Sequence, residues 1–116
     1  MKRRNLLFII CIFLPLIGYA QTISLEGNWR FKLDPNDMGT SEQWHSKTLS
    51  DEIRLPGSCE EQGYGTKTQK ADTQHLTRDV AYEGKAWYQK DFEVPASWNG
   101  KHVELFLERC HWESNV

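Results

Sequence analysis

The stretch VAYEGKAWYQKDFEVP, residues 80–95, decides the fold class that this sequence predicts. Between residues 86 and 94 the side chains alternate between two faces. One face has Ala86, Tyr88, Phe92 and Val94, and the other has Trp87, Gln89, Asp91 and Glu93. A period of two is typical of a β-strand in a sheet with one face toward solvent. We therefore expect a strand over residues 86–94.

A second alternating stretch follows a turn that contains Pro95, Asn99 and Gly100. Over residues 101–108, the apolar side chains are Val103, Leu105 and Leu107, and the polar ones are His102, Glu104 and Glu108. Phe106 interrupts this pattern because it joins the polar face. Alternating strands separated by turns favour an antiparallel sandwich over a parallel α/β sheet. The predicted fold class is therefore all-β, an antiparallel β-sandwich.

Two shorter strands are expected upstream. Residues 29–33 alternate apolar and basic side chains and end at a Pro/Asn/Asp turn, and residues 52–55 form a strand that Pro56 and Gly57 stop. The polar stretch 41–49 around Trp44 predicts a loop or one short helical turn. Residues 58–78 contain few apolar side chains and predict a long loop, and such loops in compact domains are usually functional or disordered.

The first twenty residues have the features of an export signal. A basic segment with Lys2, Arg3 and Arg4 precedes the apolar stretch 6–17, and Ala20 ends a small-residue cleavage site. The apolar stretch is shorter than the roughly 20 residues that span a bilayer, so a retained membrane anchor is the weaker alternative. We expect cleavage after Ala20, a mature domain over residues 21–116, and a periplasmic or extracellular location without membrane attachment.

The charge of the chain disfavours nucleic acid as a partner. Loss of the three basic residues of the leader changes the net charge from −2 to −5. The remaining charges are mixed along every segment, whereas a surface that neutralises phosphates needs clustered Lys and Arg.

The cysteine and histidine patterns indicate no metal or cofactor. Two cysteines remain after cleavage, Cys59 and Cys110, and in an oxidising compartment they could form a disulfide. Two separate free thiols are the favoured alternative. The four histidines lack the close Cys or His companions that zinc sites show, so neither a metal nor a cofactor is expected.

Several short blocks, in one order, resemble the N-terminal sugar-binding domain of glycoside hydrolase family 2. They are residues 26–31 (EGNWRF), 53–58 (IRLPGS), 82–89 (YEGKAWYQ), 94–101 (VPASWNGK) and 105–110 (LFLERC). The resemblance covers nearly all of the mature chain. It implies a jelly-roll-type sandwich of the galactose-binding kind, placed before an immunoglobulin-like domain and a (β/α)8 barrel. The implied enzyme is similar to exported bacterial β-galactosidases and β-glucuronidases.

The same resemblance implies where this domain meets sugar. Segments of the N-terminal sandwich reach toward the barrel in family members, so Glu60, Glu61 and Gln62 are candidates for binding hydroxyl groups, with Tyr64 as a stacking face. Trp87 is a second candidate platform, although it could equally cover the sheet against a following domain. Sugar sites do combine carboxylates or amides with an aromatic side chain.

No catalytic residue is predicted in this chain. A retaining glycosidase needs two carboxyl groups roughly 5–5.5 Å apart, and the Asn-Glu pair of the family's acid/base does not occur here. Glu60-Glu61 is interpreted as a solvated pair in a loop.

Two function classes remain. The first is the non-catalytic leading part of an exported glycosidase, whose partners are a β-glycoside and the missing C-terminal domains. The second is a stand-alone carbohydrate-binding sandwich. We favour the first, because a complete module should finish its last strand and protect its sheet edges, whereas this sequence ends at Val116 directly after a strand-like segment.

Overall fold

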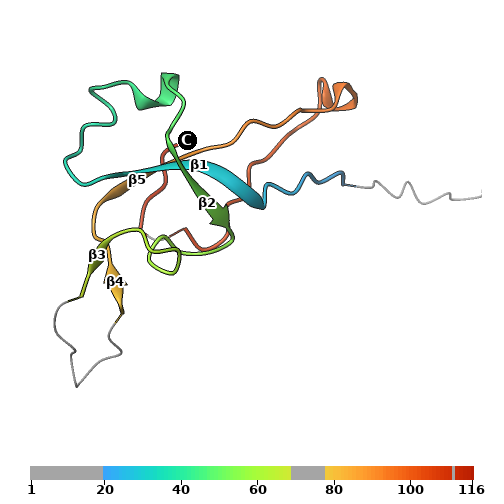
Figure 1. The fold of residues 1–116 in the computed structure, drawn as a ribbon. Helices are drawn as coiled ribbons and strands as arrows, with labels where there is room; N and C mark the ends of the chain where they lie inside the picture. The colour runs from blue at the N-terminus through green and yellow to red at the C-terminus, as the bar shows by residue number, and fades with distance from the viewer. Residues whose placement is uncertain (1–19, 69–77, 111) are drawn as a thin grey trace, which may run out of the picture.

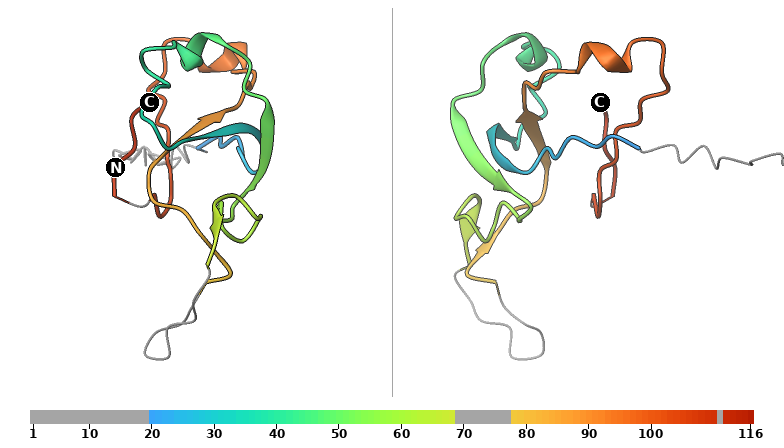
Figure 2. Two further views of the ribbon diagram at one scale, coloured as in Figure 1. Left: turned by 60° about the vertical axis from the view of Figure 1, so that its left-hand side comes forward. Right: turned by 90° about the vertical axis from the view of Figure 1, so that its right-hand side faces the viewer.

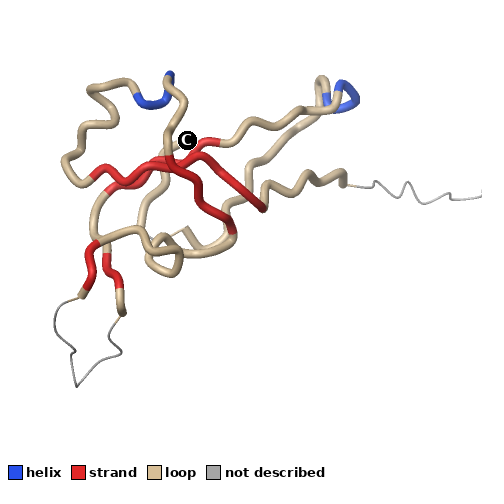
Figure 3. The backbone as a smooth tube through the Cα atoms, in the orientation of Figure 1, coloured by secondary structure: helices blue, strands red, loops and turns tan. Residues whose placement is uncertain are grey.

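The computed structural model describes residues 20–68, 78–110 and 112–116. The expected export signal over residues 1–20 therefore lies outside the described residues, apart from Ala20. The described part of the chain is built from strands, two short 3-10 helices and loops (Figure 1, Figure 3). It contains no helix long and apolar enough to cross a membrane.

The main sheet has three antiparallel strands, with β1 (Gly27–Asp34) between β2 (Asp51–Leu55) and β5 (Lys85–Gln89). Figure 1 shows β1 crossing the centre of the molecule. Trp29 pairs with Ile53, and Phe31 pairs with Tyr88. Directly opposed residues share one face of a sheet, so these four apolar side chains lie on the same face. This confirms the all-β antiparallel class and the strands expected over residues 29–33 and 52–55.

Phe31 is the centre of the core on this face. It is 0% exposed and Ile53 is 2% exposed. The Phe31 ring lies 4.8 Å from the Tyr64 ring and 5.0 Å from the Tyr88 ring, measured between centroids. Such tilted and edge-on pairs stabilise a core by roughly 0.5–1.5 kcal/mol beyond the area that they bury. Phe31 thereby links the sheet to the loop that holds Tyr64.

The opposite face of the sheet is covered by the loop between β1 and β2. This loop contains η1 (Trp44–Ser46), which confirms the expected short helical turn. Trp44 and Leu49 are both buried, and the Lys32 ammonium group lies 3.9 Å from the centre of the Trp44 ring. The Gln89 amide anchors the loop: its nitrogen donates to the Lys47 carbonyl at 2.7 Å, and its oxygen accepts from the Leu49 N–H at 3.1 Å.

The long loop expected over residues 58–78 is partly ordered by a two-stranded ladder. β3 (Thr66–Lys67) pairs with β4 (Val80–Ala81), and this small hairpin projects away from the main sheet (Figure 1). Residues 69–77, between β3 and β4 in the sequence, lie outside the described residues.

The structure corrects three predictions for the C-terminal half. The strand expected over residues 86–94 ends at Gln89, and residues 101–108 are not in a strand. Beyond Gln89 the Lys90 ammonium group, rather than a backbone N–H, donates to the carbonyls of Glu26 and Asn28 at 3.2 and 3.1 Å. The ladder stops there, and the following segment runs out to η2 (Ala96–Trp98) in the expected turn (Figure 2).

The third correction concerns which face of β5 meets solvent. Trp87 and Gln89, expected on the wet face, are half-buried beneath the Trp44 loop, while Tyr88 is 41% exposed. Both faces of the sheet are therefore partly covered. The apolar side chains after β5 are exposed instead, among them Phe92, Val94, Val103, Leu105 and Phe106.

Candidate functional site

The predicted sugar-contacting residues of the loop lie in one tight turn after β2. Backbone N–H groups of Gln62 and Tyr64 both donate to the Cys59 carbonyl, at 3.2 and 2.9 Å. Ser58 and Glu61 bond each other reciprocally, because each backbone N–H donates to the other side chain at 3.2 Å. This arrangement resembles the capping box that starts a helix, and it explains why the chain turns here.

The Gln62 side chain hydrogen-bonds the backbone groups on the outer edge of β2. Its side-chain oxygen accepts from the Arg54 N–H at 2.8 Å, and its side-chain nitrogen donates to the Arg54 carbonyl at 2.8 Å. Both Arg54 backbone groups therefore face away from β1. An unpaired strand edge invites association with other chains, and one amide side chain here takes the place of a neighbouring strand. The amide that was predicted to bind sugar hydroxyls is thus engaged within the fold.

Tyr64 and Trp87 also have partners inside the domain. The Tyr64 hydroxyl donates to the Glu52 carbonyl at 2.6 Å, and its ring packs on Phe31. The Trp87 indole donates to the Asp34 carboxylate at 3.0 Å and meets the Trp44 ring at 6.1 Å. Both aromatic residues therefore stabilise the packing of a loop against the sheet.

Asp34 is the buried charge on which the Trp87 contact depends. Burial by itself would raise the pKa of Asp34, but hydrogen bonds from the Trp87 indole and from the Gly39 and Met38 backbone N–H groups outweigh it and lower that pKa. The two backbone bonds are 2.8 and 2.7 Å long. A carboxylate that accepts several N–H groups is stabilised in its charged form.

Glu60 has the electrostatics of an ion pair rather than of a general acid. Its carboxylate lies 2.9 Å from the Arg78 guanidinium group and accepts a bond from the Cys59 thiol at 3.4 Å. Its own backbone N–H, together with these two groups, lowers the pKa of Glu60 despite partial burial. A carboxyl group that donates a proton near neutral pH needs a raised pKa instead.

Cys59 and Cys110 are free thiols in the structure. Cys59 is half-buried, and burial, with the adjacent Glu60 carboxylate, raises the pKa of its thiol. A raised pKa makes a thiol less reactive. Cys110 is exposed. The possible Cys59–Cys110 disulfide of the sequence analysis stays a prediction.

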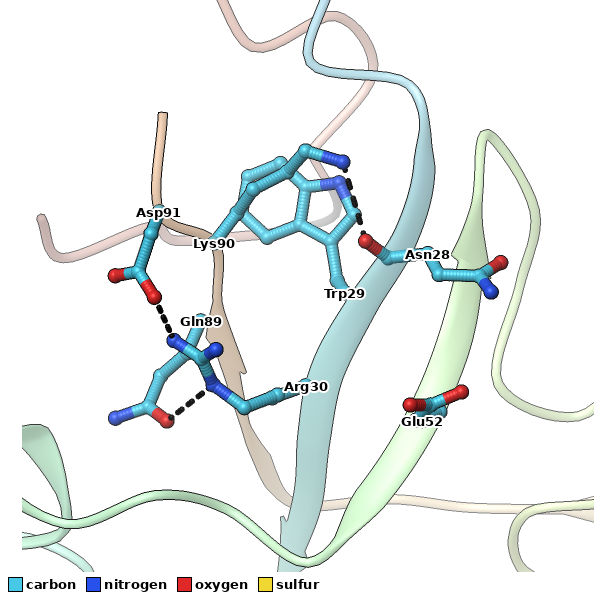
Figure 4. Close-up of a pocket in the computed structure, with 7 residues that line it drawn as sticks. All are labelled: Asn28, Trp29, Arg30, Glu52, Gln89, Lys90 and Asp91. Atoms are coloured by element: carbon cyan, nitrogen blue, oxygen red, sulfur yellow. Dashed lines mark hydrogen bonds and ion pairs between the residues drawn. The ribbon is translucent and has the colours of Figure 1, made fainter. Parts of the chain in front are cut away.

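A concave site lies where β5 separates from β1, a region that the sequence analysis missed. We call it the β1–β5 pocket; its volume is about 280 Å³, and its lining residues are Asn28, Trp29, Arg30, Glu52, Gln89, Lys90 and Asp91 (Figure 4). None of the predicted sugar-contacting residues lines it. The available signal was the polar side of the strand over residues 29–33, but the register that brings Glu52 and Gln89 beside it is not visible in the sequence.

Two interactions organise the pocket. The Arg30 guanidinium group contacts the Asp91 carboxylate at 2.7 Å and the Gln89 side-chain oxygen at 3.4 Å. The Lys90 ammonium group lies 5.8 Å from the centre of the Trp29 ring while it donates to two backbone carbonyls. Figure 4 shows Lys90 and Trp29 on one side and Glu52 across β1 on β2. Among residues 20–68, 78–110 and 112–116, no cluster of three His, Cys, Asp or Glu side chains could hold a metal ion.

Comparison with known proteins identifies the family of this domain. The chain is 39% identical over 88 residues to a protein named β-glucuronidase from Paenibacillus borealis, and the aligned stretch covers 75% of this chain and 13% of that protein. No solved structure matches the chain. Residues 22–111 match the family described as glycosyl hydrolases family 2, sugar binding domain. Since this match spans most of the chain, the protein belongs to that family.

Proposed function

We propose that the chain is the leading, non-catalytic part of an exported family 2 glycoside hydrolase, which hydrolyses β-glycosidic bonds in carbohydrate metabolism. The observation that supports this most strongly is the match of residues 22–111 to the family's sugar-binding domain. The 88 residues that align with the relative make up only 13% of that protein. The substrate is a β-galactoside or a β-glucuronide, and the name of the relative favours the glucuronide.

The chemistry of the described residues supports a non-catalytic role. Glu60 is paired with Arg78 and has a lowered pKa. Glu61 is bonded to the Ser58 backbone N–H at 3.2 Å. The Glu60 carboxyl group is therefore not poised to donate a proton to a leaving group. The domain's contribution to the enzyme is then structural and recognitional: it packs against the catalytic domain and helps to shape the sugar site.

The export signal expected from the sequence supports the same assignment. The basic segment at residues 2–4, the apolar stretch 6–17 and the cleavage site at Ala20 suit an enzyme that meets its glycoside in the periplasm or outside the cell.

A domain exchange tests the proposal. In the β-glucuronidase relative, the 88 aligned residues are replaced by those of this chain, and kcat/KM is measured with aryl β-glucuronides and aryl β-galactosides. We expect the chimera to be active and the 116-residue chain alone to show only background hydrolysis. Turnover by the chain alone that Glu60→Gln or Glu61→Gln abolishes would contradict the non-catalytic role. An inactive, misfolded chimera would contradict the family role of the domain.

The second candidate function is a stand-alone carbohydrate-binding module. The β1–β5 pocket favours it, because a recess lined by polar and charged residues is present within the chain itself. A folded, monomeric chain that binds sugar without any further domain would support this alternative.

A further inference from the structure

The segment before β1 is tied to η2 by one long-range hydrogen bond. The Trp98 indole N–H donates to the Gln21 side-chain oxygen at 2.6 Å, across 77 positions of the chain. Figure 1 shows both segments on the right-hand side of the molecule. The turn holds Trp98 at both backbone groups, because its N–H donates to the Pro95 carbonyl and its own carbonyl accepts from the Lys101 N–H, each at 2.9 Å. A fixed, half-buried indole therefore presents its donor to an exposed Gln21.

The two polar atoms of the Gln21 amide have different surroundings. An indole N–H can only donate, so the amide atom that faces Trp98 is the oxygen. No described residue accepts a hydrogen bond from the amide nitrogen of Gln21. The oxygen is anchored and the nitrogen is not. This difference matters because Gln21 is the residue that the expected cleavage after Ala20 would place at the amino terminus.

An amino-terminal glutamine can cyclise on its own side chain. The α-amine attacks the side-chain carbonyl carbon, a bond forms between the α-nitrogen and Cδ, and the bond between Cδ and Nε2 breaks. A proton passes from the amine to Nε2, which leaves as ammonia, and the product is a lactam ring, pyroglutamate. The reaction consumes no oxidant or cofactor. Oε1 remains as the lactam oxygen, and it carries negative charge in the tetrahedral intermediate, where a positioned hydrogen-bond donor lowers the barrier.

We propose that Gln21 of the mature chain is cyclised to pyroglutamate, and that the Trp98 indole first promotes this reaction and then holds the lactam oxygen. The atom that Trp98 binds is the one that survives cyclisation, and the unanchored nitrogen is the one that leaves. Cyclisation also removes the α-ammonium charge, which would be costly to hold against a half-buried aromatic ring. This inference rests on the export that belongs to the proposed function, because only cleavage after Ala20 gives Gln21 an α-amine.

The test uses a longer form of the domain-exchange chimera, in which residues 1–111 of this chain, leader included, form the amino terminus of the β-glucuronidase relative. Freshly secreted protein is incubated at neutral pH, and samples are digested with trypsin over time. Mass spectrometry then follows the peptide 21–30, which ends at Arg30 and becomes lighter by one ammonia when Gln21 cyclises. We expect the cyclised form to accumulate until it replaces the uncyclised one.

Two tryptophan variants locate the donor. Trp98→Phe keeps an aromatic ring but removes the N–H, and it should slow cyclisation about threefold to tenfold, because one hydrogen bond to the developing oxyanion is lost. Trp112→Phe makes the same chemical change at a side chain that is 96% exposed and should leave the rate unchanged. In concentrated urea, wild type and Trp98→Phe should cyclise at the same rate, because the contact requires the fold.

A second measurement tests the contact after the reaction. Once both proteins are fully cyclised, amide hydrogen exchange in residues 22–25 should be faster in Trp98→Phe than in wild type, because the lactam oxygen has lost its donor. The kcat/KM of the chimera with an aryl β-glucuronide should be the same in both proteins, which shows that the variant is folded.

Several outcomes would overturn this inference. A mature chain that begins at Gln21 and keeps its α-amine would overturn it and leave the proposed function standing. Equal cyclisation rates in folded wild type and Trp98→Phe would overturn the role of Trp98. Recovery of an intact Met1 terminus would remove both the export and this inference. An inactive chimera in which Gln21 still cyclises more slowly in Trp98→Phe would count against the proposed function alone.

Discussion

The edge of β2 provides the sharpest test of whether the loop after it serves structure or sugar binding. Gln62→Ala removes a side-chain amide that makes two bonds of 2.8 Å to the Arg54 backbone. A typical intramolecular hydrogen bond contributes about 0.5–1.5 kcal/mol. Because Gln62 is exposed and water can replace part of these bonds, we expect a total loss of about 1–2 kcal/mol. This loss in the free energy of local opening corresponds to roughly a 5- to 30-fold change in the equilibrium constant for that opening.

The measurement is amide hydrogen exchange at Arg54, followed in the domain-exchange chimera so that the domain has its full context. Exchange of this amide should accelerate about 5- to 30-fold in Gln62→Ala, since local opening controls exchange. Gln62→Glu should give an intermediate result, because a carboxylate can still accept from the Arg54 N–H but cannot donate to the Arg54 carbonyl. Glu93→Ala, an exposed truncation elsewhere, is the matched control and should leave the Arg54 rate unchanged.

One result would refute this reasoning. If Gln62→Ala leaves the Arg54 amide fully protected but weakens sugar binding, the amide is a ligand contact, as the sequence analysis proposed, and its bonds to Arg54 contribute nothing measurable.

The remaining predictions concern acid sensitivity, export and the isolated chain. The pKa of Asp34 is lowered in the folded state, so its contribution to stability should be present above the unfolded pKa of about 3.9 and lost as pH falls through the lower folded pKa. The difference in Met38 and Gly39 amide protection between wild type and Asp34→Asn should therefore be largest above pH 4 and shrink below it; a difference that is constant with pH would contradict this. Mass spectrometry of the secreted product should find Gln21 at its amino terminus, whereas an intact Met1 in the membrane fraction would indicate an anchor. The purified 21–116 fragment should aggregate or be loosely packed, because apolar side chains such as Phe92, Val103 and Phe106 are exposed. Size-exclusion chromatography and near-ultraviolet circular dichroism would show this, and a monomer that melts cooperatively would instead favour the stand-alone binding module.

Local pattern was sufficient to predict the fold class and the upstream strands. The alternation at residues 29–33 and the Pro56-Gly57 stop after residues 52–55 are features of neighbouring residues, and the structure has β1 and β2 at these places. The short helical turn around Trp44 was predicted in the same way. The blocks that resemble family 2 hydrolases were likewise recognisable from their order alone, and the family match over residues 22–111 confirms them.

Only the tertiary structure decided where the strand expected over residues 86–94 ends and which faces of the sheet are covered. Alternation shows that a segment suits a strand, but a strand also needs a partner for its backbone groups. Residues 90–94 lose that partner when the Lys90 side chain takes the carbonyls of Glu26 and Asn28. Trp87 was expected on a solvent-facing side, yet the loop that carries Trp44 folds over it.

For the candidate site, too, the sequence predicted one part and only the tertiary structure decided the rest. From residue types alone, Gln62 and Tyr64 were as suitable for sugar as for structure, and only their bonds to Arg54 and Glu52 show which backbone groups they satisfy. The β1–β5 pocket was invisible in the sequence, because it joins residues that are about sixty positions apart along the chain, such as Arg30 and Asp91. Sequence therefore determined the local elements and the family of this protein. The register between distant strands, which depends on long-range backbone pairing and packing, determined its surfaces and its pocket.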